Sequence, residues 1–449
     1  MNKPATALAI CLCASAAMAD AVVPTVSGVH LEQKRSRAVV ITYTLANGPA
    51  VVTFDIQTNC TVNGQQTWTS IGGRNIDCYS GDGNRLVTGD TEHRIEWHPD
   101  KSWPDHTIPA GGARAVVTAW APDNTPDYMV VDLAETSANR VRYYASTNDL
   151  PGGLLDNEAY RTTLLVMRRI HAKNVPWTMG SYFEEGRTAS TETTHHVMLT
   201  NDYYMGVFEI TQGQWAMVKG TEVSAQISNP FKRLLRPMEN ISTAMMRESG
   251  SNTQNSNAWY PNPPDGDSFL GVLRERTQLD FDLPSEAQWE FAARAGNGED
   301  RWGDGSPYKL LNGTYSADYP VPGRWKQNQA SPTTYTGGNS EATPENCTAV
   351  CGSYPPNSFG LYDMHGNVYE ICLDWYKADI TALGGAVNYE SGETASSGTY
   401  AGKRLIVRKG GNWNQGNTAL LRAADRQNEP STVRCPYDGF RVMCRAGLK

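Results

Sequence analysis

In the stretch GLYDMHGNVYEICLDWY, from Gly360 to Tyr376, two of the acidic side chains lie on either side of a glycine turn. A turn through Gly366 can bring Asp363 and Glu370 to one side, with the carbonyls of Gly366 and Val368 pointing at the same spot. Calcium takes about six to eight oxygen ligands of these kinds. The stretch is therefore compatible with a calcium site formed by these four residues. The spacing alone favours the structural alternative, in which Asp363 caps a turn and Glu370 makes a surface ion pair.

Outside this stretch, the composition is that of a globular protein. The chain has 449 residues, enough for two domains, and its 41 Gly, 25 Pro, 12 Trp and 21 Tyr favour short strands and long ordered loops. The net charge is -8 and no long run of Lys or Arg occurs. This charge pattern argues against nucleic acid or an anionic membrane surface as a partner.

The N-terminus predicts export. Lys3 precedes a short apolar run from Ala7 to Ala17, and Ala17-Met18-Ala19 has the pattern of a cleavage site. We therefore expect a signal peptide over residues 1–19 and a secreted or periplasmic mature protein. A lipid anchor is not expected, because Cys11 and Cys13 lack a preceding small residue. No later stretch is apolar enough to predict a transmembrane segment.

Seven cysteines follow the predicted signal peptide, and an oxidising compartment favours disulfides. Cys60 and Cys78 are near each other in the sequence and are expected to pair. Cys347 and Cys351 favour a small loop-closing bridge or separate bridges over a metal site, because no partner pair has zinc-site spacing. The remaining cysteines are Cys372, Cys435 and Cys444.

The strand pattern predicts an α+β protein with two domains. Short β-branched and aromatic runs at 37–45, 50–56, 93–99, 114–120 and 128–133 predict a β-sandwich of immunoglobulin or fibronectin type over 20–135. Residues 136–160 are turn-rich and are expected to be a linker. The second domain, 161–449, is expected to have little regular structure.

Two helices of the second domain are marked by capping boxes. Thr211 and Gln214 predict the start of one helix, and Gly220 its end. Ser285 and Gln288 repeat the box before a second helix that ends near Gly296. No HExxH, GxSxG, GxGxxG or Walker A motif occurs, so the sequence gives little support for catalytic zinc, a hydrolase nucleophile or nucleotide binding.

A polar segment near the C-terminus mixes amides with Trp, Arg and Tyr, which is typical of recognition surfaces. The predicted ligand-binding residues are Asn412, Trp413, Asn414, Gln415, Asn417, Arg422, Asp425, Arg426 and Asn428. The alternative is that Trp413 belongs to the core and the amides satisfy loop backbone.

Eight motifs occur in a fixed order and together resemble the formylglycine-generating enzyme family, also called sulfatase-modifying factors. They are MGSYFEEGRTAS, YYMGVFEITQGQWAMVKG, RPMENIS, LPSEAQWEFAARAG, NSFGLYDMHGNVYEICLDWY, VRKGGNWN, LRAADR and DGFRV. The resemblance covers about residues 160–446 and implies a C-type-lectin-like fold.

The resemblance implies calcium at Asp363, Gly366, Val368 and Glu370, but it does not carry over the family's catalytic site. The family's enzymes oxidise a sulfatase cysteine with copper(I) held by two cysteines after a Gly-Gly-Ser corner. Here the corner is Gly410-Gly411-Asn412, and residues 410–434 contain no cysteine. Copper is therefore not expected, no catalytic residue is assigned, and enzymatic activity stays open.

The leading hypothesis is a calcium-stabilised scaffold that binds an unknown protein or glycan at the cell surface. The alternatives are a formylglycine-generating oxidoreductase, another metal-dependent oxidase on the same fold, and a matrix component attached to the envelope.

Overall fold

The computed structural model describes residues 23–137, 140–221, 224, 232–248, 259–297, 302–313, 316–328, 347–386, 394 and 401–447. The predicted signal peptide lies outside these residues. Strands dominate the described part, with a few short helices, as the sequence predicts for the second domain.

Two sheets pack around one core in the N-terminal region. The first has the order β1-β2-β7-β5 and the second β4-β3-β6, with β8 pairing along the other edge of β3. Their bounds are β1 Thr25–Gln33, β2 Val39–Ala46, β3 Ala50–Val62, β4 Gln65–Ser70, β5 Tyr79–Gly81, β6 Arg85–Val87, β7 Glu92–Trp97 and β8 Ala113–Trp120. Alternate residues of β2 and β3, including Ile41, Tyr43, Val52 and Phe54, are buried between the sheets.

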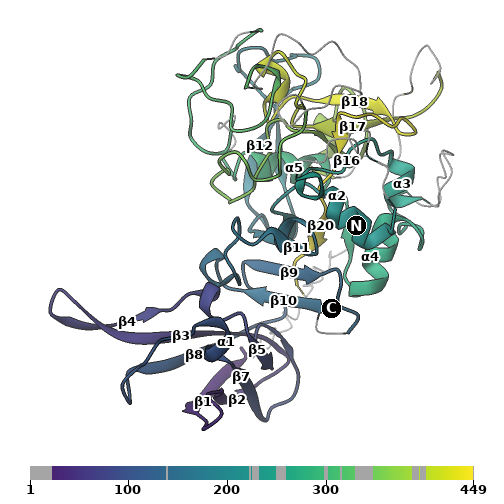
Figure 1. Cartoon of the computed structure of the whole chain (residues 1–449). Coiled ribbons are helices and arrows are strands. Elements are labelled where there is room, and N and C mark those ends of the chain that lie inside the picture. The colour runs from purple at the N-terminus through teal and green to yellow at the C-terminus, as the bar shows by residue number, and fades with distance from the viewer. Residues whose placement is uncertain are drawn as a thin grey trace, which may run out of the picture.

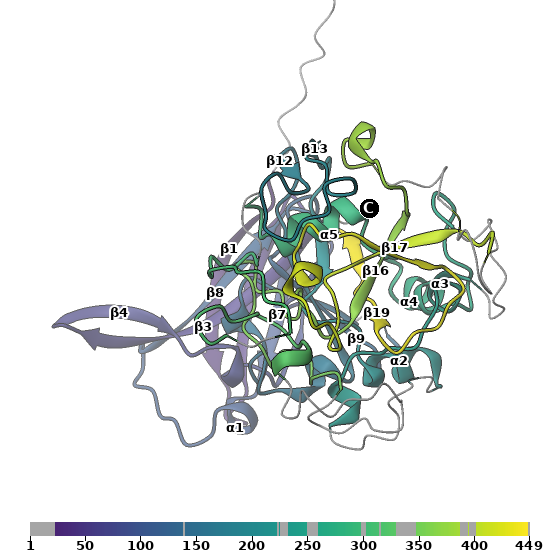
Figure 2. The same cartoon turned by 90° about the horizontal axis from the view of Figure 1, so that it is seen from above.

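The hairpin of β3 and β4 extends away from this core (Figures 1 and 2). Its turn is Asn63-Gly64, with φ of 50° and 79°, the left-handed conformation that two-residue hairpin turns require. Every residue of β4 is exposed, and β4 pairs with β3 alone. Among the described residues, β4 is therefore an edge strand held away from the body of the protein.

A six-stranded sheet forms the centre of the molecule, in the order β10-β9-β11-β14-β20-β15. Its strands are β9 Tyr128–Asp132, β10 Val141–Tyr144, β11 Leu164–Ile170, β14 Tyr203–Gly206, β15 Phe281–Asp282 and β20 Met443–Arg445. The expected domain boundary differs here, since 128–133 was assigned to the first domain and 136–160 to a linker. Both β9 and β10 join the sheet of the second domain, because Val130 and Val131 pair with Val166 and Leu165.

Helices and two smaller sheets surround the central sheet (Figure 1). These helices are α2 Gln212–Lys219, α3 Thr243–Arg247, α4 Phe269–Thr277 and α5 Glu286–Ala293, whereas α1 Pro99–Ser102 lies with the N-terminal sheets (Figure 1). One small sheet pairs β12 Pro176–Met179 with β13 His195–Met198, and the other has the order β18-β17-β16-β19. Its strands are β16 Tyr369–Trp375, β17 Leu405–Lys409, β18 Gln427–Pro430 and β19 Asp438–Gly439.

Both predicted capping boxes are confirmed. The Thr211 side chain accepts from the Gln214 N–H at the start of α2, and Gly220 ends this helix in the left-handed conformation. The Ser285 side chain accepts from the Gln288 N–H at the start of α5. The sequence analysis missed α4, although Ser268 caps it in the same way.

The seven cysteines of the described residues are all free thiols. The expected Cys60–Cys78 disulfide is absent, because Cys60 lies on the projecting hairpin beside Thr67 and Thr69, whereas Cys78 precedes β5 in the other sheet. Cys347 and Cys351 are also unbridged, and their thiols contact Arg236 and Glu209 respectively. Within the described ranges, none of the helices has the length and hydropathy needed to span a bilayer.

Candidate functional site

The stretch around Asp363 forms a tight, buried corner that leads into β16. Asp363 and Asn367 adopt φ of 59° and 61°, and Gly366 a φ of 126°. A Cβ at Gly366 would lie 2.2 Å from the Arg324 carbonyl oxygen, so this position requires glycine. Val368, the other predicted carbonyl ligand, follows at once and is fully buried. The corner thus holds the four predicted calcium residues within one rigid segment.

Glu370 lies on β16 and is held by two neighbours. Arg441 donates from Nε and Nη2 to the two oxygens of its carboxylate, at 2.6 and 2.5 Å. Trp289 Nε1 donates to one of the same oxygens at 2.6 Å. Since Arg441 and Glu370 are both buried, this is a core ion pair and not the surface pair that the sequence suggested as an alternative.

Asp363 has an open oxygen. Its Oδ2 accepts from the Gly352 N–H at 2.6 Å, while Oδ1 is buried and has no hydrogen-bond partner. Burial raises the pKa of this carboxyl to about 6, and the nearby Glu370 carboxylate also raises it. A buried carboxylate oxygen without a donor is the kind of group that a cation satisfies. This observation fits the predicted calcium site, in which Asp363 would supply the open oxygen.

Two further groups that sequence reasoning missed lie beside Asp363. Glu209 and Cys351 are both fully buried, and the Cys351 thiol donates to Glu209 Oε2 at 3.4 Å. Burial raises the pKa of the Glu209 carboxyl well above its ordinary range, and the Asp363 carboxylate raises it further. Glu209 stands directly before the capping box of α2 in the sequence. No local signal connects it to a residue more than a hundred positions later.

The predicted ligand-binding residues divide into two groups in the structure. Partly exposed are Asn414, Gln415, Asn417 and Asn428, whereas Asn412, Trp413, Arg422, Asp425 and Arg426 are buried. The alternative that Trp413 belongs to the core is therefore confirmed. The five buried residues lie where they support the segment, and only the four partly exposed ones are accessible from solvent.

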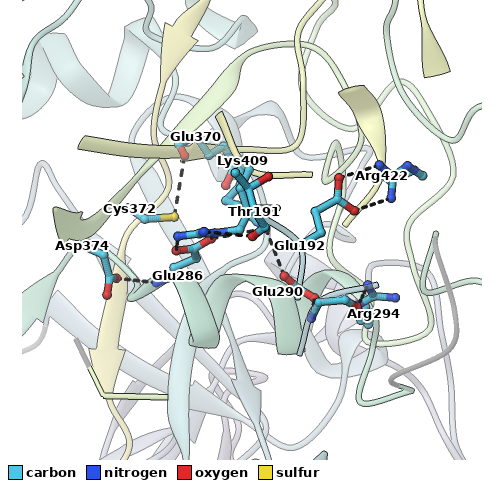
Figure 3. Close-up of polar contacts among 12 residues, drawn as sticks. Thr191, Glu192, Glu286, Glu290, Arg294, Glu370, Cys372, Asp374, Lys409 and Arg422 are labelled. Carbon is cyan, nitrogen blue, oxygen red and sulfur yellow. Dashed lines mark hydrogen bonds and ion pairs between the residues drawn. The ribbon is translucent and has the colours of Figure 1, made fainter. Parts of the chain in front are cut away.

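Ion pairs hold the two arginines of this segment in place, and Figure 3 shows the pair of Arg422 with Glu192. Arg422 donates to Glu184 at 2.6 Å and to both oxygens of Glu192 at 2.8 and 2.9 Å. Arg426 contacts both oxygens of Glu286, at 2.5 and 2.9 Å. Both guanidinium groups thus bind internal carboxylates, and few of their N–H donors remain for a ligand.

The same network continues along α5. Lys409 Nζ donates to Glu290 at 3.0 Å, and Arg294 pairs with the other oxygen of this carboxylate at 3.0 Å. Burial raises the pKa of Glu290, but Lys409 and Arg294 outweigh it and lower the value to about 2. The segment that carries the polar amides therefore rests on a rigid, charge-paired foundation.

Three of the four partly exposed side chains are held by local hydrogen bonds. Gln415 Nε2 donates to Tyr369 Oη at 3.0 Å, and Asn414 Nδ2 contacts Tyr437 Oη at 3.4 Å. Asn417 accepts from the Ala419 N–H and so caps a short helical turn. The amides are thus oriented before any ligand arrives.

Comparisons with known proteins identify the family of this part of the chain. Residues 168–446 match the family model of the sulfatase-modifying factor enzyme 1-like domain, which covers the corner, the network and the polar segment. The chain belongs to this family.

Relatives of the sulfatase-modifying factor domain include proteins with different names. The chain is 33% identical over 247 residues to the "Serine/threonine-protein kinase pkn1" of Chlamydia pneumoniae, a match covering 55% of this chain and 33% of the relative. It is 34% identical over 101 residues to the "Formylglycine-generating enzyme" of Thermomonospora curvata, covering 22% of this chain and 28% of the relative. These matches therefore span about a third of the length of these relatives.

Solved structures also match the sulfatase-modifying factor domain. The structure of PvdO from Pseudomonas aeruginosa covers 63% of this chain and 94% of its own, with a TM-score of 0.43 and 21% identity. The Treponema denticola variable protein 1 covers 63% of this chain and 96% of its own, with a TM-score of 0.42 and 23% identity.

Proposed function

We propose that this protein is an extracytoplasmic binding or structural scaffold, in which the sulfatase-modifying factor domain presents a fixed polar surface to a protein or glycan. The surface consists of the side chains of Asn414, Gln415, Asn417 and Asn428. The proposal rests on the composition and hydrogen bonding of residues 410–434. This segment contains amides held by local hydrogen bonds where the resemblance places copper-binding cysteines.

Calcium is the proposed brace of the scaffold. Asp363 would contribute its open Oδ1, and the carbonyls of Gly366 and Val368 would add oxygens from the same corner. Glu370 would join by exchanging one of its contacts with Arg441 or Trp289 for the ion. Calcium supplies no redox chemistry here and would act by fixing the corner that leads into β16.

The N-terminal region is proposed to be a spacer of immunoglobulin or fibronectin type. Its two sheets with a shared core support a sandwich, although the inter-sheet disulfide typical of antibody domains is absent from the described residues. In the sequence, Lys3 followed by the apolar run from Ala7 to Ala17 supports export through a cleaved signal peptide.

The surface is tested by binding of the purified mature protein to arrayed bacterial glycans and to surface-protein extracts. Asn414→Ala combined with Gln415→Ala should weaken capture at least about tenfold, because oriented amides are lost. The matched control is Gln66→Ala, an exposed amide on β4, which should bind as the unmodified protein does. Equal binding by the double variant and the control would reject this surface.

The calcium brace is tested by elemental analysis and by thermal unfolding with and without calcium. We expect about one calcium per chain at this corner and an unfolding temperature that rises with calcium concentration. An Asp363→Asn variant should lose the calcium-dependent rise. Stoichiometric copper, together with oxygen-dependent conversion of a cysteine-containing sulfatase peptide, would instead support the oxidase alternative.

A further inference from the structure

Three possible metal ligands converge beneath the corner from separate parts of the chain. Glu209 follows β14, Cys351 lies in the loop before the corner, and Asp363 lies in the corner itself. One ligand atom from each of the three lies within 4.8 Å of the others. All three side chains are buried, with exposed fractions of 0% or 1%.

The three groups are oriented without any ion. Glu209 Oε1 accepts from the Val368 N–H at 3.2 Å, and Oε2 accepts from Asn367 Nδ2 at 2.6 Å. The Gly352 N–H, next to Cys351, fixes Asp363 Oδ2 at 2.6 Å. Donors of this kind set the direction of ligating carboxylates in metal sites.

One lone-pair site of the cluster is unused. Asp363 Oδ1 is buried and has no hydrogen-bond partner, although an unpaired polar atom in a dry interior is unfavourable. It is therefore an independent sign that the cluster accommodates a further group.

The surrounding charges favour a cation. Three carboxylates face one another here, those of Glu209, Asp363 and Glu370. Arg441 is committed to Glu370, and Arg161 directs Nη1 and Nη2 to the carbonyl oxygens of Cys351 and Leu155. Arg441 thus neutralises mainly the Glu370 carboxylate. Among the described residues, neither Glu209 nor Asp363 forms a direct ion pair.

We propose that Glu209, Cys351 and Asp363 form a buried site for a thiophilic divalent cation of the zinc class. A thiolate with two carboxylates is a ligand set for zinc or cobalt, whereas calcium selects oxygen alone. Binding requires the Cys351 thiol to release its proton to solvent. The three protein ligands leave the fourth position of a tetrahedron for a water molecule.

This site uses two ligands, Glu209 and Cys351, that the proposed calcium brace does not use. It also binds a different class of ion. The two sites share Asp363, so an ion in one weakens binding in the other. The inference stands independently of calcium, because neither Glu209 nor Cys351 belongs to the calcium set and Glu370 has no part in it.

Cobalt(II) is the probe that tests the site. The full mature chain is stripped with a chelator, dialysed into calcium-free buffer and titrated with cobalt(II) under nitrogen. We expect about one cobalt per chain, visible bands of a four-coordinate ion, and a near-ultraviolet charge-transfer band from a thiolate bound to cobalt. Zinc should then displace cobalt and remove both features.

Cys351→Ser should abolish the charge-transfer band and weaken zinc binding at least about tenfold. Cys444→Ser is the matched control, since Cys444 is an equally buried thiol on β20 outside the cluster. Circular dichroism shows whether each variant is folded. Should Cys351→Ser fail to fold, the spectrum of the unmodified protein and that of Glu209→Gln decide the question.

Absence of the band in the folded, unmodified protein would overturn the proposal, and so would an undiminished band in folded Cys351→Ser. Calcium uptake is measured separately, by adding calcium to a cobalt-free portion of the stripped chain. A chain that binds calcium without giving a thiolate–cobalt band would reject this site and leave the calcium brace standing. A thiolate–cobalt band in a chain that takes up no calcium would support this site and reject the calcium brace.

Discussion

Arg441 and Glu370 form a two-point ion pair in the core, with Nε and Nη2 of the guanidinium at 2.6 and 2.5 Å from the two carboxylate oxygens. Arg441 also donates to the carbonyl oxygens of Gly206 at 2.8 Å and Tyr362 at 2.9 Å. One side chain thus connects the end of β14, the corner and β16. The pair fixes the corner to the central sheet.

Replacing Arg441 by Met should lower the free energy of unfolding by about 3–5 kcal/mol, because it leaves Glu370 buried without its cation. Adding Glu370→Gln in the same chain should restore part of the loss. Denaturant unfolding of both single variants and the double variant measures the coupling. Lys34→Ala, which breaks an exposed pair with Glu32, is the control and should change stability little.

Arg422 offers a test of whether the buried residues of the polar segment support it. Arg422→Lys loses the fork that reaches Glu184 and both oxygens of Glu192, so we expect a loss of about 2–4 kcal/mol in unfolding free energy. Asn414→Ala, on the partly exposed face, should lose less than about 1 kcal/mol. Similar small losses in both variants would place Arg422 in the ligand surface instead.

Asp425 predicts a pH dependence of stability. Burial, with Glu192 as a second cause, raises the pKa of its carboxyl to about 6, so the folded protein holds this proton at a pH where the unfolded chain has lost it. The stabilisation is complete below about pH 4 and is lost as the pH rises through 6.

Asp425→Asn removes this titration. Relative to the unmodified protein, the variant should therefore gain about 3 kcal/mol of unfolding free energy between pH 4 and pH 7.5. Urea unfolding at a series of pH values measures the difference between the two proteins, in which the contributions of other buried acids cancel. A difference that is constant with pH would contradict the prediction.

Ser285 tests the locally encoded part of the fold. Ser285→Ala removes the acceptor for the Gln288 N–H at the start of α5 and should lower the unfolding free energy by about 1 kcal/mol. Ser285→Thr keeps the oxygen and should lose less. The comparison is made by thermal unfolding, and equal losses would show that the cap oxygen contributes nothing.

The parts of the fold that the sequence predicted depend on neighbours in the chain. Capping boxes span three residues, and β-branched runs identify strands such as β2, β3 and β8. Which strands pair with one another was harder to predict. β9 pairs with β11, although the residues between them are rich in turns and have the composition of a linker.

The candidate site shows the same limit more strongly. Arg422 appeared to be a surface residue because its carboxylates, Glu184 and Glu192, lie 238 and 230 positions away. Asp363 and Glu370 were recognised together because they are seven residues apart, whereas Glu209 lies in a separate motif. Sequence spacing identified the corner but did not reveal the groups that complete it.

The shared central sheet also has a mechanical consequence. β10 lies against the N-terminal sheets, where the Tyr143 N–H donates to the Asn84 carbonyl at 2.8 Å, and β10 and β9 continue into β11. Tension applied to the N-terminal sheets would therefore act on the backbone hydrogen bonds of β9 and β10 and not on a flexible linker. A fragment starting at residue 161 would lose two strands and leave β11 with a bare edge. We therefore expect the two regions to unfold together and a truncation between them to destabilise the second region.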